Sequence, residues 1–114
     1  NRIIKATNPG LQGLGLVRDS QESRVHKQTI KKLAVAYERA EFHVKADHIH
    51  EYDYPGKFPM LKPDIVAEKN GRKILVEVET RNSVGTPRDK RQRREFGRWA
   101  KQEKTRDFRR EIAG

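Results

Sequence analysis

The sequence predicts a single α/β domain made of a helix, a three-stranded antiparallel meander and a C-terminal basic helix. Two observations predict it: Asn70-Gly71 separates two runs rich in β-branched and apolar residues, and apolar residues recur at helical spacing on either side of that pair. At 114 residues the chain is long enough for one modest core. We therefore assign residues 19–114 to one domain and residues 1–18 to an N-terminal arm.

The first helix is predicted from about Ser20 to Ala40. Asp19-x-x-Glu22 resembles a capping box at its start. Its apolar stripe consists of Val25, Ile30, Leu33, Ala34 and Tyr37. We expect this stripe to pack on the sheet.

A first strand is predicted over residues 42–50, where apolar and polar residues alternate. Residues 51–61 then form a loop rich in aromatic and turn-forming residues. This loop could pack against the core or could offer a surface on which bases stack.

The Asn70-Gly71 turn fixes the register of the predicted hairpin. A two-residue turn pairs Lys69 with Arg72 and sets Asp64 directly opposite Glu77. Opposed residues share a face, so one face is wholly apolar and consists of Pro63, Ile65, Ala67, Ile74, Val76 and Val78. We expect that face to be core, and the other face carries Asp64, Val66, Glu68, Lys73, Leu75, Glu77 and Glu79.

The carboxylates on the second face are candidates for a metal site. Asp64 opposite Glu77 places like charges on Cβ atoms roughly 5 Å apart, which is destabilising unless a cation lies between them. Hard oxygen ligands suit Mg²⁺ or Mn²⁺, and water and substrate phosphate usually complete the coordination. Glu22 could add another oxygen ligand if its end of the helix points toward the hairpin, or it could serve only as the capping partner. The alternative is a solvated face neutralised by Lys and Arg.

The composition favours a polyanionic partner. The chain has 26 Lys and Arg against 16 Asp and Glu, a net charge of +10. Binding to nucleic acid through released counterions fits this charge, whereas clustered carboxylates oppose such binding unless metal neutralises them. The absence of cysteine excludes disulfides and thiolate zinc sites and is compatible with a cytoplasmic location. No apolar run is long enough for a membrane span, and no signal peptide is expected.

The C-terminal helix is predicted to begin with Thr86 as N-cap and Pro87 at the first helical position. Arg91, Arg94, Arg98 and Lys101 fall within about 80° on its helical wheel, opposite Phe96, Trp99 and Ala100. We expect the apolar face to pack on the sheet and the basic face to bind DNA phosphates. Phe108 and Ile112 would lie on another face, so the helix would bend near residues 103–106 or pack against another chain.

The histidines do not predict a zinc site. His48-x-His50 on a strand would place two imidazoles on one face near Asp53, but no third and fourth ligand follow at a suitable spacing. We interpret these histidines as solvated or core-edge residues.

Pro63-Asp64, a gap of twelve residues and Glu77-x-Glu79 together resemble the motif of the PD-(D/E)xK nuclease superfamily. This superfamily includes restriction endonucleases and archaeal Holliday junction resolvases. The resemblance implies an αβββαβ core of the restriction-endonuclease type, Asp64 and Glu77 as ligands of Mg²⁺ or Mn²⁺, and hydrolysis of duplex or branched DNA. A domain that cuts both strands would commonly act as a homodimer.

Two departures accompany the resemblance. Glu79 stands where the superfamily usually has Lys, so Glu79 would act as general base or bind a second metal, and Lys62 or Lys73 would supply the missing cation, Lys62 being the better placed. A catalytically inactive basic nucleic-acid-binding module is the alternative. The fourth strand of that fold is not evident after the last helix, so it is missing, replaced by Ile3-Ile4 or supplied by another copy of the chain.

Overall fold

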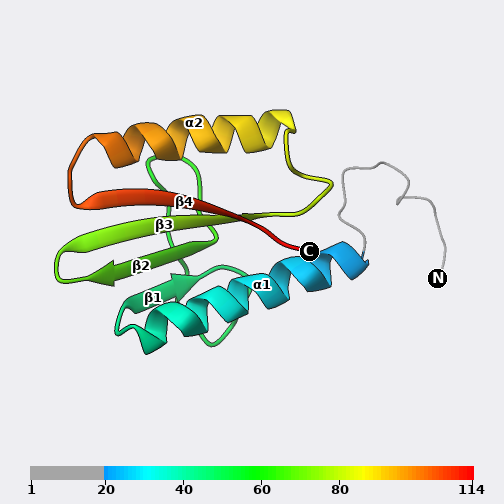
Figure 1. Ribbon diagram of the computed structural model, residues 1–114, viewed down its shortest axis with the longest axis horizontal. Helices are drawn as coiled ribbons and strands as arrows, with labels where there is room; N and C mark the ends of the chain where they lie inside the picture. The colour runs from blue at the N-terminus through cyan, green and yellow to red at the C-terminus, as the bar shows by residue number, and fades with distance from the viewer. Residues whose placement is uncertain (1–19) are drawn as a thin grey trace.

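The computed structural model describes residues 20–114, which form two helices and one four-stranded mixed sheet (Figure 1). The prediction of an α/β fold is confirmed. The predicted arm, residues 1–18, lies outside the described residues, as does Asp19 of the proposed capping box. The elements, in chain order, are α1 (Ser20–Arg39), β1 (His43–Ala46), β2 (Ile65–Lys69), β3 (Arg72–Glu79), α2 (Pro87–Lys101) and β4 (Arg106–Ile112).

The strands lie in the order β1-β2-β3-β4. β1 and β2 pair antiparallel, as do β2 and β3, and β4 joins β3 in parallel. The parallel pair requires a crossover, which α2 provides. Figure 1 shows the sheet as a layer between α2 above it and α1 below it.

The β2–β3 turn has the predicted register. Asn70 and Gly71 have φ values of 50° and 79°. Positive φ at both central residues is what a two-residue type I′ hairpin turn requires. Ile65 pairs with Val76 and Lys69 with Arg72, as predicted. Each strand residue therefore points to the face that the turn predicts.

Both faces of the sheet are covered. On the α1 side the predicted apolar face of the hairpin packs with Ile30 and Ala34 of the predicted helical stripe. On the other side Val66 and Leu75 pack against Phe96 and Trp99 of α2. The second face thus forms a second small core at its centre, and Asp64, Glu77 and Glu79 lie toward the end of β3.

The chain after α2 differs from the prediction. The N-cap is right, since Thr86 Oγ1 accepts a 3.2 Å hydrogen bond from Asp89 N, but the helix ends at Lys101 and residues 106–112 form β4. The fourth strand is therefore present within the described chain, and Phe108 and Ile112 are strand residues. The sequence Arg106–Ile112 has no regular apolar alternation, so it does not predict a strand. In the structure β4 pairs with β3 along its length, and its Phe108 packs against Phe96 of α2.

The first strand is shorter than predicted and ends at Ala46. His48 has a φ of 69°, so the chain turns away from the strand there. In the loop that follows, the ring of Phe58 packs edge-on against Trp99 at 5.5 Å, whereas Tyr54 is 58% exposed. Part of this aromatic loop is therefore packed and part faces solvent.

Candidate metal centre

Asp64 immediately precedes β2, and both neighbouring strands hold it in place. Its main-chain N–H donates to Glu77 Oε1 at 3.1 Å, and its carbonyl accepts from Asp47 N at 2.8 Å. Its own carboxylate Oδ2 accepts from Val78 N at 2.8 Å. The structure thus brings Asp64 and Glu77 together, each carboxylate fixed by the other residue's strand.

These acidic side chains are buried. Asp64 is 7% exposed, and Glu77 and Glu79 are each 4% exposed. Burial, and next the negative charges of Asp64 and Glu79, together raise the pKa of Glu77 to about 9, against smaller lowering effects of the Asp64 N–H and of Arg88. Glu77 therefore holds its proton at neutral pH unless positive charge enters the site.

Glu79 faces the beginning of α2. Its Oε1 accepts a 2.7 Å hydrogen bond from Ser83 Oγ. Burial raises the pKa of Glu79, as do the neighbouring carboxylates of Asp89 and Asp64, while the Ser83 hydroxyl and Arg110 lower it. The side chain has a raised proton affinity and is held in one orientation.

Among residues 20–114, Asp89 is the one buried acid at this end of the sheet that is ion-paired to an arginine, and its partner is Arg110. Asp89 is 1% exposed, and both of its oxygens accept from Arg110 Nη2, at 3.1 and 2.9 Å. Arg110 lies beside Glu77 in the β3–β4 pairing. Sequence analysis missed this pair because Arg110 was not expected to lie on a strand.

A second set of donors shares Asp64. One donor atom each from Asp47, His48 and Asp64 lies within 4.8 Å of the others, so this group could hold a metal ion. His26 of α1 lies behind it, its Nε2 donating to Val78 O at 2.9 Å and lying 3.5 Å from Asp64 Oδ2. The ring of His26 meets that of His48 edge-on at 5.6 Å.

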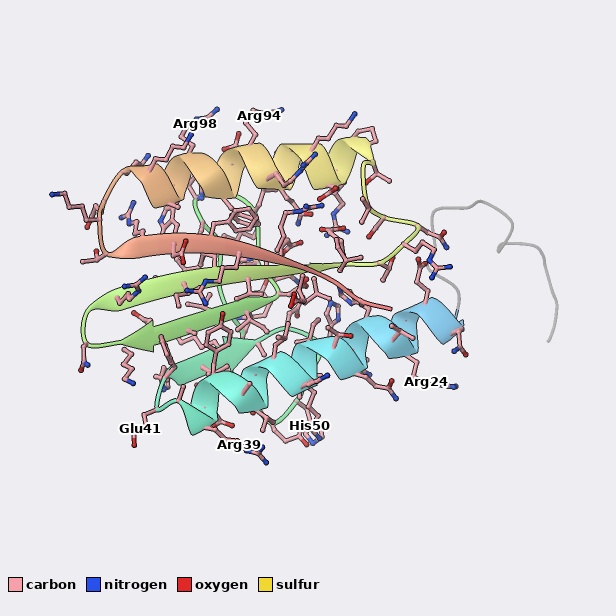
Figure 2. The ribbon with its side chains drawn as sticks, viewed as in Figure 1. Arg24, Arg39, Glu41, His50, Arg94 and Arg98 are labelled. Atoms are coloured by element: carbon pink, nitrogen blue, oxygen red, sulfur yellow. The ribbon has the colours of Figure 1, made fainter. Side chains whose placement is uncertain are left out.

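Sequence analysis missed Asp47 and His26 and considered His48 only in a pair with His50. His50 is not part of the group, since its side chain is 95% exposed and points away from the sheet (Figure 2). A pattern that could have identified Asp47 is its place directly after β1, because adjacent antiparallel strands bring the end of one beside the start of the next.

The lysines expected to replace the missing cation have other partners. Lys62 Nζ lies 2.9 Å from Asp47 Oδ2, which raises the pKa of Lys62, and Lys73 Nζ lies 3.3 Å from Glu68 across the strands. Lys62 is therefore at the edge of the Asp47, His48 and Asp64 group, and Lys73 is directed elsewhere. Glu22 Oε2 accepts from Thr80 Oγ1 at 2.6 Å, so its end of α1 does point toward the end of β3.

The predicted DNA-binding residues lie on the outer face of α2. Arg91, Arg94, Arg98 and Lys101 are all exposed. In Figure 2 the side chains of Arg94 and Arg98 point away from the sheet. Arg98 is also ion-paired to Glu95 at 3.3 Å, which leaves Arg94 the better placed of these two to bind an anion.

Comparisons of the chain with protein-family models, with curated proteins and with solved structures found no match. Within residues 20–114, neither helix has the length and apolar character needed to cross a membrane.

Proposed function

We propose that this chain is a metal-dependent nuclease that hydrolyses phosphodiester bonds of DNA, with Asp64 and Glu77 at its catalytic centre. The observation that carries the proposal is the placing of these two buried carboxylates against each other in a chain of net charge +10. Burying like charges together is costly, and a divalent cation offsets that cost. A polyanionic substrate is the natural partner of the surrounding positive charge.

Asp64 and Glu77 would hold Mg²⁺ or Mn²⁺, whose preferred ligands are carboxylate oxygens. When bound, the ion supplies Lewis-acid stabilisation of the reacting phosphate and activates water. The group formed by Asp47, His48 and Asp64 offers a neighbouring position, and its imidazole makes it better suited to Mn²⁺ than to Mg²⁺. Asp64 belongs to both arrangements, so it is the residue on which metal binding depends most.

Glu79 is the candidate for proton transfer. Its raised pKa favours a carboxylate that accepts a proton from the attacking water, and Ser83 holds its orientation. The motif that this sequence resembles usually has a lysine at the position of Glu79, and that lysine is absent here. Lys62, held by Asp47 at the edge of the group, is the lysine to which we assign the stabilisation of developing negative charge.

The element order supports the proposal. Helix, three strands, helix and strand is the order that the resemblance to PD-(D/E)xK nucleases implies, and β4 fills the place that sequence analysis left open. Asp64 precedes the second strand, and Glu77 and Glu79 end the third, as in that motif.

Plasmid nicking tests the function directly. We expect the protein to relax supercoiled DNA with Mg²⁺ or Mn²⁺ but not with chelator, and Asp64→Ala to abolish cleavage while DNA binding stays equal or becomes stronger. Glu68→Ala, which removes an acid of β2 outside the site, is the matched control and should cleave normally. Cleavage by Asp64→Ala at the wild-type rate would refute the assignment.

One observation favours a second candidate, a catalytically inactive DNA-binding module. Among the described residues no lysine is ion-paired to Asp64, Glu77 or Glu79, since Lys62 and Lys73 pair elsewhere. In that case DNA would bind in a salt-dependent manner and remain uncut in every divalent metal. The same nicking experiment separates the two functions.

A further inference from the structure

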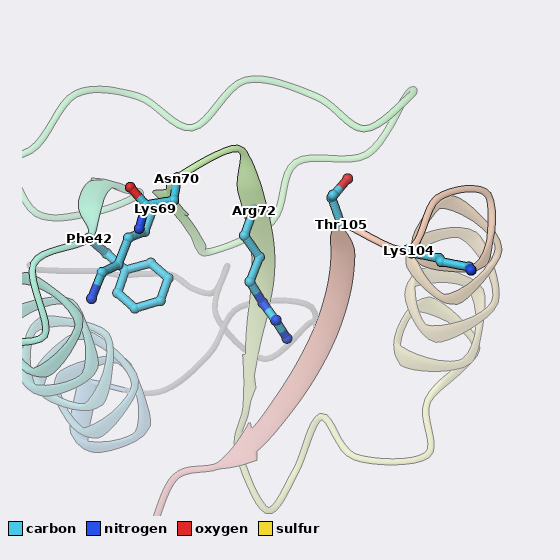
Figure 3. A pocket seen from close by; sticks show the side chains of 6 residues that line it. All are labelled: Phe42, Lys69, Asn70, Arg72, Lys104 and Thr105. Carbon is cyan, nitrogen blue, oxygen red and sulfur yellow. The ribbon is translucent and has the colours of Figure 1, made fainter.

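A cleft of about 340 Å³ lies at the hairpin end of the sheet, far from the buried carboxylates. Its lining comes from the start of β1, the β2–β3 turn and the α2–β4 connection, and consists of Phe42, Lys69, Asn70, Arg72, Lys104 and Thr105 (Figure 3). We propose that this cleft binds a backbone phosphate of the nucleic acid strand that the carboxylate site cleaves. That this strand is the substrate rests on the proposed nuclease function.

The charge of the cleft is the first argument. Three of its six lining residues are cationic, Lys69, Arg72 and Lys104, and none is acidic. Arg72 and Lys104 have no acidic partner within residues 20–114. Gathering three like charges is unfavourable, and an anion reverses that cost. Phosphate suits such a site, because guanidinium groups bind it through paired N–H donors and ammonium groups bind it as point charges.

The second argument is that part of the lining is already held in position. Lys69 Nζ donates to Ala40 O at 2.7 Å and lies 5.4 Å from the centre of the Phe42 ring. The Phe42 ring packs edge-on against Tyr37, and Thr105 O accepts from Lys73 N at 2.9 Å. Figure 3 shows the Arg72 side chain extending between Phe42 on one side and Lys104 on the other. The cations thus lie beside an aromatic and polar wall that is held in place, which suits a phosphate attached to a sugar and base.

The third argument is the spacing along β3. Arg72 begins this strand and Glu77 is five residues further on, a separation of about 17 Å at about 3.3 Å per residue. One strand of a duplex rises about 3.4 Å per nucleotide, so that separation corresponds to about five nucleotides. Because Arg72 and Glu77 are an odd number of residues apart, their side chains leave opposite faces of β3, so one strand contacts both sites only if it crosses from one face of the sheet to the other.

The test is DNA binding in the presence of chelator, so that no cleavage occurs. The double variant Arg72→Gln/Lys104→Gln is compared with Lys32→Gln/Arg39→Gln, which removes one lysine and one arginine from exposed positions of α1. With a strand of about 12 nucleotides, we expect the cleft variant to bind about 10-fold more weakly and its salt-dependence slope to fall by about 1 to 2. The control should change by less than about 2-fold. Equal losses in the two variants would overturn the proposal.

A second arm separates a nucleic acid from a free nucleotide. Adenosine monophosphate should bind the wild-type protein only at millimolar concentrations or not at all. Tight binding of this nucleotide that the cleft variant loses would assign the cleft to a free nucleotide instead. The two proposals can fail separately. If the protein cuts plasmid but both double variants bind DNA equally well, the nuclease proposal stands and the phosphate-binding role of the cleft is refuted.

Discussion

The two ends of β3 have opposite electrostatic character. At its C-terminal end Glu77 and Glu79 are buried beside Asp64, and at its N-terminal end the exposed Arg72 lines a cleft with two lysines. The strand between them, from Ile74 to Val76, is buried among apolar side chains. Each end therefore gathers charge of one sign without equal charge of the other.

The difference lies in what each arrangement costs the protein. The cations of the cleft are long, solvated side chains, so their mutual repulsion is screened. The carboxylates have been removed from water, which disfavours their charged form and raises the pKa of Glu77. The acidic end thus needs a cation or a proton, whereas the basic end only gains from an anion. The predictions that follow perturb one end at a time.

Glu77→Gln should produce the largest effect, because it keeps the shape of the side chain and removes a metal ligand. We expect metal-dependent cleavage to fall by about 100-fold or more. The metal-free protein should at the same time unfold at a higher temperature than wild type above neutral pH, since the variant cannot carry the buried charge. Nicking assays and thermal denaturation measure the two quantities. A variant that loses cleavage and also loses stability would contradict the electrostatic account.

Asp89→Ala tests the buried acid that is ion-paired to an arginine. Removing it leaves the partly buried Arg110 guanidinium unpaired and removes the acceptor for Gly85 N, 2.7 Å away. We expect a loss of about 3–5 kcal/mol in the free energy of unfolding, the usual effect of breaking a buried ion pair. Chemical denaturation measures this loss.

Glu95→Gln is the matched control, because Glu95 pairs with Arg98 on the exposed face of the same helix. That change should alter the free energy of unfolding by less than about 1 kcal/mol. If both variants lose the same stability, the Asp89–Arg110 pair does not stabilise this end of the sheet as the structure indicates.

The pH dependence of stability should reveal the carboxylate end. The pKa of Glu77 rises from 4.5 to about 9 on folding, so between these values the unfolded chain releases a proton that the folded chain retains. Stability of the metal-free protein should therefore fall as pH rises through that window. Mg²⁺ or Mn²⁺ should raise the melting temperature more near pH 8.5 than near pH 6, because the ion competes with the proton. Glu77→Gln should flatten the pH profile, and a profile that stays as steep would assign it to other groups.

Sequence reasoning was reliable where a local pattern determines the structure. The Asn70-Gly71 turn fixes the hairpin register, which brings Asp64 to Glu77, and Thr86-Pro87 marks the start of α2. Both depend on the backbone preferences of two adjacent residues. The part of the site that lies on the hairpin could therefore be predicted before any contact was known.

The remaining parts of the site depend on contacts between distant segments. β4 has too few apolar residues to be recognised, and its place beside β3 follows from the crossover through α2. Without β4, Arg110 could not be placed beside Glu77. Asp47 and His48 reach Asp64 because the chain turns at His48 with a left-handed φ, which no residue pattern in that segment predicts.

The smallest predicted effect concerns the outer face of α2, a third basic region. Arg94 is exposed and points away from the sheet (Figure 2), so it can contact DNA only if the duplex also covers this helix. Arg94→Gln should then weaken DNA binding by a few-fold and lower the salt-dependence slope by about 1, with cleavage per bound complex unchanged. Titrations at several salt concentrations measure both quantities. Arg98→Gln should have less effect, because Arg98 is already ion-paired to Glu95. If neither variant changes the slope while Arg72→Gln/Lys104→Gln does, DNA is bound at the hairpin cleft, and the basic stripe of α2 is a solvated surface.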